Sequence, residues 1–89
     1  MKSYEDFFEQ MRGVMAEEYE VSPEKITSEA QLVATLDLDS LDMVDVVALV
    51  DNKLGIVLRA EDFQGVQTFG DFFHMLYGKL EQQEASRHR

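Results

Sequence analysis

The chain has 89 residues, no Cys, and 18 Asp and Glu against 8 Lys and Arg, which gives a formal net charge of −10. This length predicts one small domain, and without Cys no disulfide bond supplements its core. The negative charge argues against nucleic acid and anionic bilayers as partners, because both carry phosphate groups, and favours basic protein surfaces. Acidic residues occupy positions 5 and 6, and the longest apolar run spans residues 46–50. We therefore expect a cytoplasmic protein without stable membrane insertion.

The first predicted helix spans residues 3–18. Its apolar side chains recur every three or four residues with polar residues between them, a spacing typical of an amphipathic helix. These apolar residues are Tyr4, Phe7, Phe8, Met11, Val14 and Met15. Pro23 prevents the helix from continuing, so residues 19–39 are predicted to form a long, mostly polar connection. The expected anchors of this connection in the core are Ile26, Leu32 and Leu36.

A second helix is predicted over residues 40–54. It ends at Gly55, because glycine readily adopts the left-handed conformation that follows a helix. After it, Ile56 and Leu58 are expected to point inward, and residues 60–63 to form one short helical turn. This turn is the short helix of the predicted fold.

The last predicted helix begins after Thr68, which with Asp71 forms a capping box. Its apolar residues are Phe69, Phe72, Phe73, Leu76 and Leu80. Together the elements predict an all-α protein, an irregular four-helix bundle of three long helices and one short one. We assign the bundle to residues 1–80 and expect a monomer in which residues 81–89 form a frayed polar tail.

The predicted helix 40–54 carries apolar residues on more than one face. At about 100° per residue, one sector faces the presumed core and a second lies roughly opposite it. The first holds Met43, Val47, Val50 and Leu54; the second holds Asp42, Asp45, Leu49 and Asn52; and Leu41, Val44 and Ala48 border the second.

The same helix and the residues before it are strongly acidic. Residues 37–51 contain Asp37, Asp39, Asp42, Asp45 and Asp51 but no Lys or Arg. Such a surface is either a solvated polar face or a docking site for a basic patch, and the pattern leaves both open.

Ser40 stands at the head of this helix, where a serine is most often a helix cap. Here, however, the run Asp-Ser-Leu-Asp-Met-Val-Asp at residues 39–45 resembles the acyl carrier protein family, whose Asp-Ser-Leu motif carries 4′-phosphopantetheine on the serine. Residues 36–58 fit the family segment as a block, and the similarity extends over about residues 4–80. The length, acidity and helix order of the chain agree with the family as well.

The resemblance implies that a phosphopantetheinyl transferase moves 4′-phosphopantetheine from coenzyme A to the Ser40 hydroxyl. The thiol of this arm would carry acyl groups as thioesters in fatty-acid or related polyketide or lipid biosynthesis, which fits a chain that has no Cys of its own. The residues that the resemblance places against basic docking patches of acyl-processing enzymes are Asp39, Leu41, Asp42, Val44, Asp45, Ala48 and Asp51. Those that it places around a cavity for the acyl chain are Val47, Val50, Leu54, Leu58 and Phe63.

The chain departs from the family pattern at three places. Asp37 stands near where many members carry Gly, and Met43 occupies a position that is often smaller and polar. The last helix is also more aromatic than that of the housekeeping fatty-acid carrier, which is compatible with a dedicated secondary pathway.

Two alternatives stay open at this point. One is a carrier of aminoacyl or other non-fatty groups with the same fold, and the other is an unmodified acidic helical binding module in which Ser40 only caps the helix. We do not expect an enzyme, because Ser40 lacks a Gly-x-Ser-x-Gly turn and the only histidines are His74 and His88. No metal site is expected either, since the sequence that begins like a calcium loop at Asp37 has Ala48 where the loop needs Glu.

Overall fold

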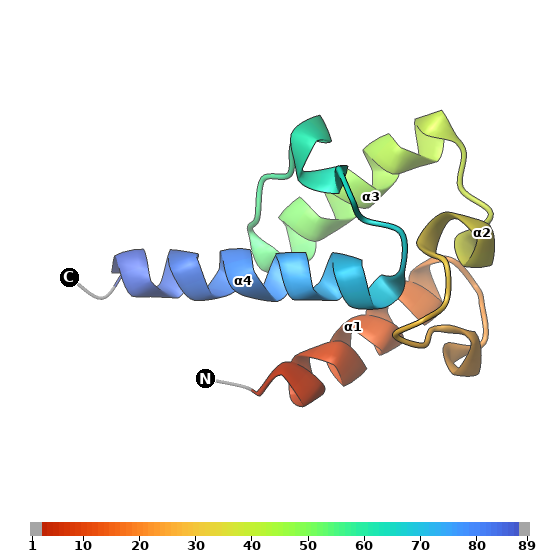
Figure 1. Cartoon of the computed structure of the whole chain (residues 1–89), viewed down its shortest axis with the longest axis horizontal. Coiled ribbons are helices and arrows are strands. Elements are labelled where there is room, and N and C mark those ends of the chain that lie inside the picture. Colours follow the sequence, from red (N-terminus) through yellow and green to blue (C-terminus); the bar gives the residue numbers. More distant parts are fainter. Residues whose placement is uncertain (1–2, 88–89) are drawn as a thin grey trace.

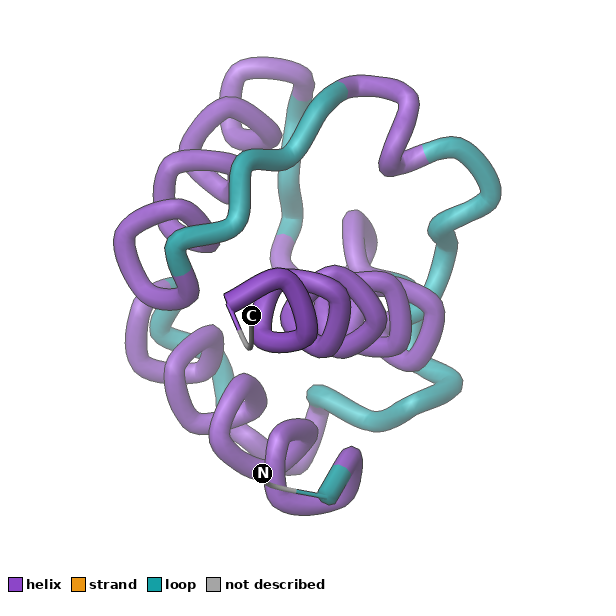
Figure 2. The backbone as a smooth tube through the Cα atoms, turned by 90° about the vertical axis from the view of Figure 1, so that its left-hand side faces the viewer, coloured by secondary structure: helices purple, strands orange, loops and turns teal. Residues whose placement is uncertain are grey.

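This computed structural model describes residues 3–87, except for the side chains of residues 40 and 84–87. Helices make up most of this part of the chain. The elements are α1 (Tyr4–Glu18), η1 (Pro23–Lys25), α2 (Leu32–Leu36), α3 (Ser40–Leu54), η2 (Ala60–Phe63) and α4 (Phe69–Arg87). In Figure 1, α4 runs along the longest axis, with α1 and α3 on either side of it. Figure 2 looks nearly along α4 and shows the other elements arranged around it. The predicted all-α fold class is confirmed, and α4 is the central helix.

The amphipathic character predicted for α1 is present in the structure. The Ser3 side chain caps the helix by accepting a hydrogen bond from the Asp6 N–H (3.2 Å). Along its inner face, Phe7, Met11 and Met15 are buried. The helix therefore buries the stripe that its spacing predicts.

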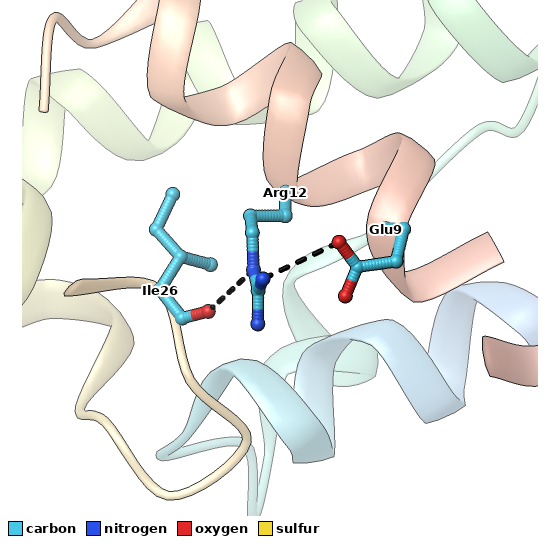
Figure 3. Close-up of polar contacts among 3 residues, drawn as sticks. All are labelled: Glu9, Arg12 and Ile26. Atoms are coloured by element: carbon cyan, nitrogen blue, oxygen red, sulfur yellow. Dashed lines mark hydrogen bonds and ion pairs between the residues drawn. The ribbon is translucent and has the colours of Figure 1, made fainter. Parts of the chain in front are cut away.

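A polar contact fastens the long connection to α1 (Figure 3). The Arg12 side chain donates a hydrogen bond through Nε to the Ile26 carbonyl (3.1 Å) and pairs with the Glu9 carboxylate (3.3 Å). With its carbonyl held in this way, Ile26 is fully buried in the core. Leu32 and Leu36 are buried too, so the three expected anchors of the connection are confirmed.

Helix α2 lies inside residues 19–39, which the sequence predicted to be a long, mostly polar connection. It has only five residues, Leu32–Leu36, and its two ends are the buried anchors Leu32 and Leu36. The Leu32 N–H donates to the carbonyl of Gln67 (2.9 Å), which precedes α4. A helix of one turn is too short to be stable alone, so α2 depends on tertiary contacts, which a local sequence pattern does not reveal.

Helix α4 begins as predicted and extends further than predicted. Asp71 accepts a hydrogen bond from the Thr68 N–H (3.2 Å), and the Thr68 hydroxyl accepts one from the Asp71 N–H (3.1 Å), so the capping box is confirmed. The expected frayed tail is corrected in part, because the helix includes residues 81–87. Good helix formers follow Gly78 without a proline, and this continues the helix. Residues 88–89 lie outside the described residues.

Candidate functional site

The start of α3 is fixed by two aspartates on either side of Ser40. Asp39 is the N-cap, and its carboxylate accepts hydrogen bonds from the N–H groups of Leu41 (2.9 Å) and Asp42 (3.0 Å). The Asp42 carboxylate in turn accepts a hydrogen bond from the Asp39 N–H (3.0 Å). Ser40 is the first residue of the helix, one position beyond the cap. The interpretation of Ser40 as the cap is therefore wrong, because Asp39 occupies that position and forms the reciprocal capping box.

The turn between α2 and α3 sets the direction in which the Ser40 segment leaves the core. Asp37 adopts the left-handed conformation, with φ 54° and ψ 50°. Glycine adopts this conformation most readily, and aspartate tolerates it. The Leu38 N–H then donates to the Val33 carbonyl (3.0 Å), and the Leu38 side chain is buried. The chain is thus anchored in the core two residues before Ser40.

The predicted partner-binding residues lie along the solvent side of α3. We call this set the α3 face: Asp39, Leu41, Asp42, Val44, Asp45, Ala48 and Asp51. Leu41 is 76% exposed and Val44 66% exposed, although both are large apolar side chains. Asp42 is half-buried, and the other members are exposed. An exposed apolar strip bordered by carboxylates costs solvation free energy unless something covers it, so its role as a docking surface stays our prediction.

The core-facing side of α3 is rotated relative to the prediction. Val46 is fully buried and Leu49 is 8% exposed, although Leu49 was placed opposite the core. Three of the residues predicted to face the core, Met43, Val47 and Leu54, are only partly buried, whereas Val50 is buried. The reason is that Leu49 faces the end of α1, where it shares a groove with Tyr19. A helix with apolar residues on several faces does not itself reveal which face a neighbouring helix covers.

The residues predicted to surround an acyl chain belong to the packed interior. Val50 and Leu58 are buried, and Val47, Leu54 and Phe63 pack against the core. The Phe63 and Phe72 rings stack with their centroids 5.8 Å apart. These side chains thus belong to the hydrophobic core, and its opening around an acyl chain stays a prediction.

Other chemistry has little support in the part of the chain that the structure describes. Across residues 3–87, no three His, Cys, Asp or Glu side chains are grouped so that they could hold a metal ion. The His74 ring stacks on the Tyr4 ring with centroids 4.0 Å apart, so a packing role accounts for this histidine. His88 lies outside the described residues. No helix of the described chain combines the length and apolar character needed to cross a bilayer.

A phosphopantetheine group fits the start of α3 by chemistry. The group is attached through a phosphodiester to a hydroxyl, and the neighbours of Ser40, Asp39 and Leu41, are both exposed. The N-terminal end of a helix also favours negative charge, although here Asp39 already occupies two of the free N–H groups. The exposure of both neighbours suits a group that an enzyme must attach and that other enzymes must reach.

Comparison with known proteins agrees with this geometry. The family model described as "Phosphopantetheine attachment site" matches residues 9–76. The chain is 35% identical over 66 residues to acyl carrier protein 2 of Ralstonia nicotianae, which covers 74% of this chain and 82% of that protein. It is 31% identical over 80 residues to an acyl carrier protein of Thermotoga maritima, which covers 90% of this chain and 99% of the relative. A third relative, an acyl carrier protein of Saccharopolyspora erythraea, is 34% identical over 65 residues, which are 73% of this chain and 68% of that protein. The chain therefore belongs to the acyl carrier protein family, whose members carry acyl groups on phosphopantetheine.

Proposed function

We propose that this chain is a monomeric acyl carrier of the cytoplasm, where coenzyme A is available, and that its 4′-phosphopantetheine is attached to Ser40. The supporting observation is the reciprocal cap between Asp39 and Asp42, which secures the start of α3 through the side chains of these two aspartates. The chain itself is not a catalyst. Fatty-acid, polyketide and related lipid pathways all fit this carrier role.

The attachment is a phosphoryl-group transfer from coenzyme A. The Ser40 oxygen forms a new bond to phosphorus and gives up its proton to a base of the transferase. The bond from that phosphorus to the nucleotide part of coenzyme A breaks, and adenosine 3′,5′-bisphosphate leaves. The transferred arm ends in a thiol, which supplies the nucleophile for thioester formation that a chain without Cys lacks.

Mass spectrometry of the intact chain tests this proposal. After incubation with coenzyme A, magnesium and a broad-specificity phosphopantetheinyl transferase, we expect the chain to gain the mass of one phosphopantetheinyl group. The same mixture without transferase is the control. If several competent transferases leave the mass unchanged, the proposal fails and the unmodified binding module becomes the better interpretation. The acyl or aminoacyl groups that the modified chain then accepts identify its cargo.

The α3 face is proposed to steer basic enzyme surfaces toward Ser40. Asp45 is exposed near the middle of this face. We expect Asp45→Lys to raise the KM of the transferase for the carrier about tenfold at low salt, because it replaces attraction by repulsion. The difference from the unmodified sequence should shrink as salt screens the charges.

The matched control for this reversal is Glu24→Lys. Glu24 is an exposed acid in η1, outside the α3 face, and the substitution changes the net charge equally. Circular dichroism checks that both variants remain helical. Equal KM values for the two variants would mean that only net charge matters and would contradict a docking role for the α3 face.

A further inference from the structure

A groove of about 630 Å³ lies between the end of α1 and the side of α3. From α1 it is lined by Glu18 and Tyr19, and from α3 by Asp45, Ala48, Leu49 and Asn52. Asp45 and Ala48 also belong to the α3 face, so the groove continues that face toward α1. A second helix thus contributes an aromatic side chain and a carboxylate beside the proposed docking surface.

The way in which α1 ends holds Tyr19 at this place. Tyr19 is the C-cap, and its N–H donates to the Met15 carbonyl (2.9 Å). The next residue, Glu20, takes the left-handed conformation with φ 55°, and the Val21 N–H donates to the Ala16 carbonyl (3.0 Å). This bond pattern is a Schellman motif, which turns the chain sharply after the helix. Tyr19 is therefore fixed at the groove by backbone hydrogen bonds and is half-buried against the core.

The groove combines an aromatic ring with negative charge. The pKa of Tyr19 is raised to about 12. Partial burial has the largest effect on it, followed by the negative charges of Asp45, Glu18 and Asp42 in that order. The carboxylates thus lie close enough to the phenol for their charges to act on it, and the phenol keeps its proton at neutral pH. Lys53 also lines the groove, but it lies just over two helical turns beyond Asp45, roughly 12 Å along the axis. The negative charge is concentrated at the end of the groove nearest to Tyr19.

We propose that this groove receives an arginine side chain of the enzymes that dock on the α3 face, the phosphopantetheinyl transferase included. The inference rests on the proposed function and adds Tyr19 and Glu18 of α1 to the partner site. A guanidinium stacks on the Tyr19 ring and pairs with the carboxylates of Glu18 and Asp45 on either side. Its methylene groups lie against apolar side chains of α3 in the groove.

The chemistry of the groove favours arginine over lysine. A guanidinium is planar, so it stacks on an aromatic ring and still presents donors to two carboxylates, whereas an ammonium group is compact and strongly hydrated. Here the two carboxylates come from different helices, and the ring lies beside them. A planar cation with donors along its edges matches this arrangement best.

Transferase kinetics on three variants test the proposal, with modification of Ser40 read by intact mass. We expect Tyr19→Leu to raise the KM for the carrier about fivefold with kcat unchanged, because the aromatic face is lost while the apolar volume is largely kept. Tyr19→Phe keeps the ring and should retain the native KM. Glu18→Gln should raise KM by a few-fold at low salt, because one carboxylate is lost.

Glu17→Gln is the matched control for the charge change, since Glu17 is the neighbouring exposed acid outside the groove. Urea denaturation checks that the Tyr19 variants stay folded under the assay conditions. A native KM for Tyr19→Leu, or equal effects of Glu17→Gln and Glu18→Gln, would overturn the inference while Ser40 is still modified. Failure of the native chain to be modified at all would instead overturn the proposed function.

Discussion

Replacing Ser40 by alanine is expected to abolish the gain of one phosphopantetheinyl group completely. The reason is chemical, because alanine has no oxygen to form the bond to phosphorus. The fold should persist, since Asp39 and Asp42 cap α3 through their own side chains. We expect the free energy of unfolding to change by less than about 0.5 kcal/mol, because the cap of α3 is left intact. Intact mass and urea denaturation measure the two effects separately.

Two further variants make this experiment specific. Ser22→Ala is the matched serine control, because Ser22 precedes η1 and makes no side-chain capping bond there. It should be modified like the native chain. Asp39→Ala removes the N-cap and should lower the free energy of unfolding by about 1 kcal/mol. Mass gain by the Ser40→Ala variant would show that the arm is attached elsewhere.

Replacing Phe73 by alanine is expected to have the largest effect on stability. The side chain is fully buried, and its ring contacts those of Phe8 (5.0 Å between centroids), Phe69 (5.8 Å) and Phe72 (5.9 Å). Its loss leaves a cavity where two helices meet, so we expect the free energy of unfolding to fall by about 3–5 kcal/mol. Small domains have total stabilities of roughly 5–10 kcal/mol, so this variant should be close to unfolding. Urea denaturation followed by circular dichroism measures the change.

A milder variant keeps this prediction testable if Phe73→Ala does not fold. Phe73→Leu retains most of the apolar volume and should cost about 1–2 kcal/mol. The control is Val57→Ala, at a side chain that is 69% exposed, where the change should stay within about 0.5 kcal/mol. If Phe73→Leu were as mild as Val57→Ala, the aromatic cluster would not be the centre of the core.

The long helices could be predicted because their signals are local. A cap and a spacing of three and four residues lie within one turn of each other, and the capping box of Thr68 and Asp71 forms as its sequence predicts. Gly55 ends α3 with a left-handed φ of 69°, again as its type predicts. These features depend on neighbours along the chain, so the sequence contains all the information needed.

Helix α2 and the rotation of α3 could not be predicted in this way. The five residues of α2 are stabilised by burial of Leu32 and by a backbone bond to Gln67, which lies far away in the sequence. Leu49 is buried because the end of α1 lies beside it. Both depend on which segments meet after the chain has folded.

In the candidate site, too, some features follow from local sequence and others depend on how the helices pack. The family resemblance, the attachment serine as a candidate and the acidic character of the following helix could all be inferred from the sequence, because each depends on residue type and spacing. The packing of the folded chain turns Leu49 inward. It also brought Tyr19 from the end of α1 to the side of α3, since a groove between helices is set by their packing and leaves no periodic pattern in either.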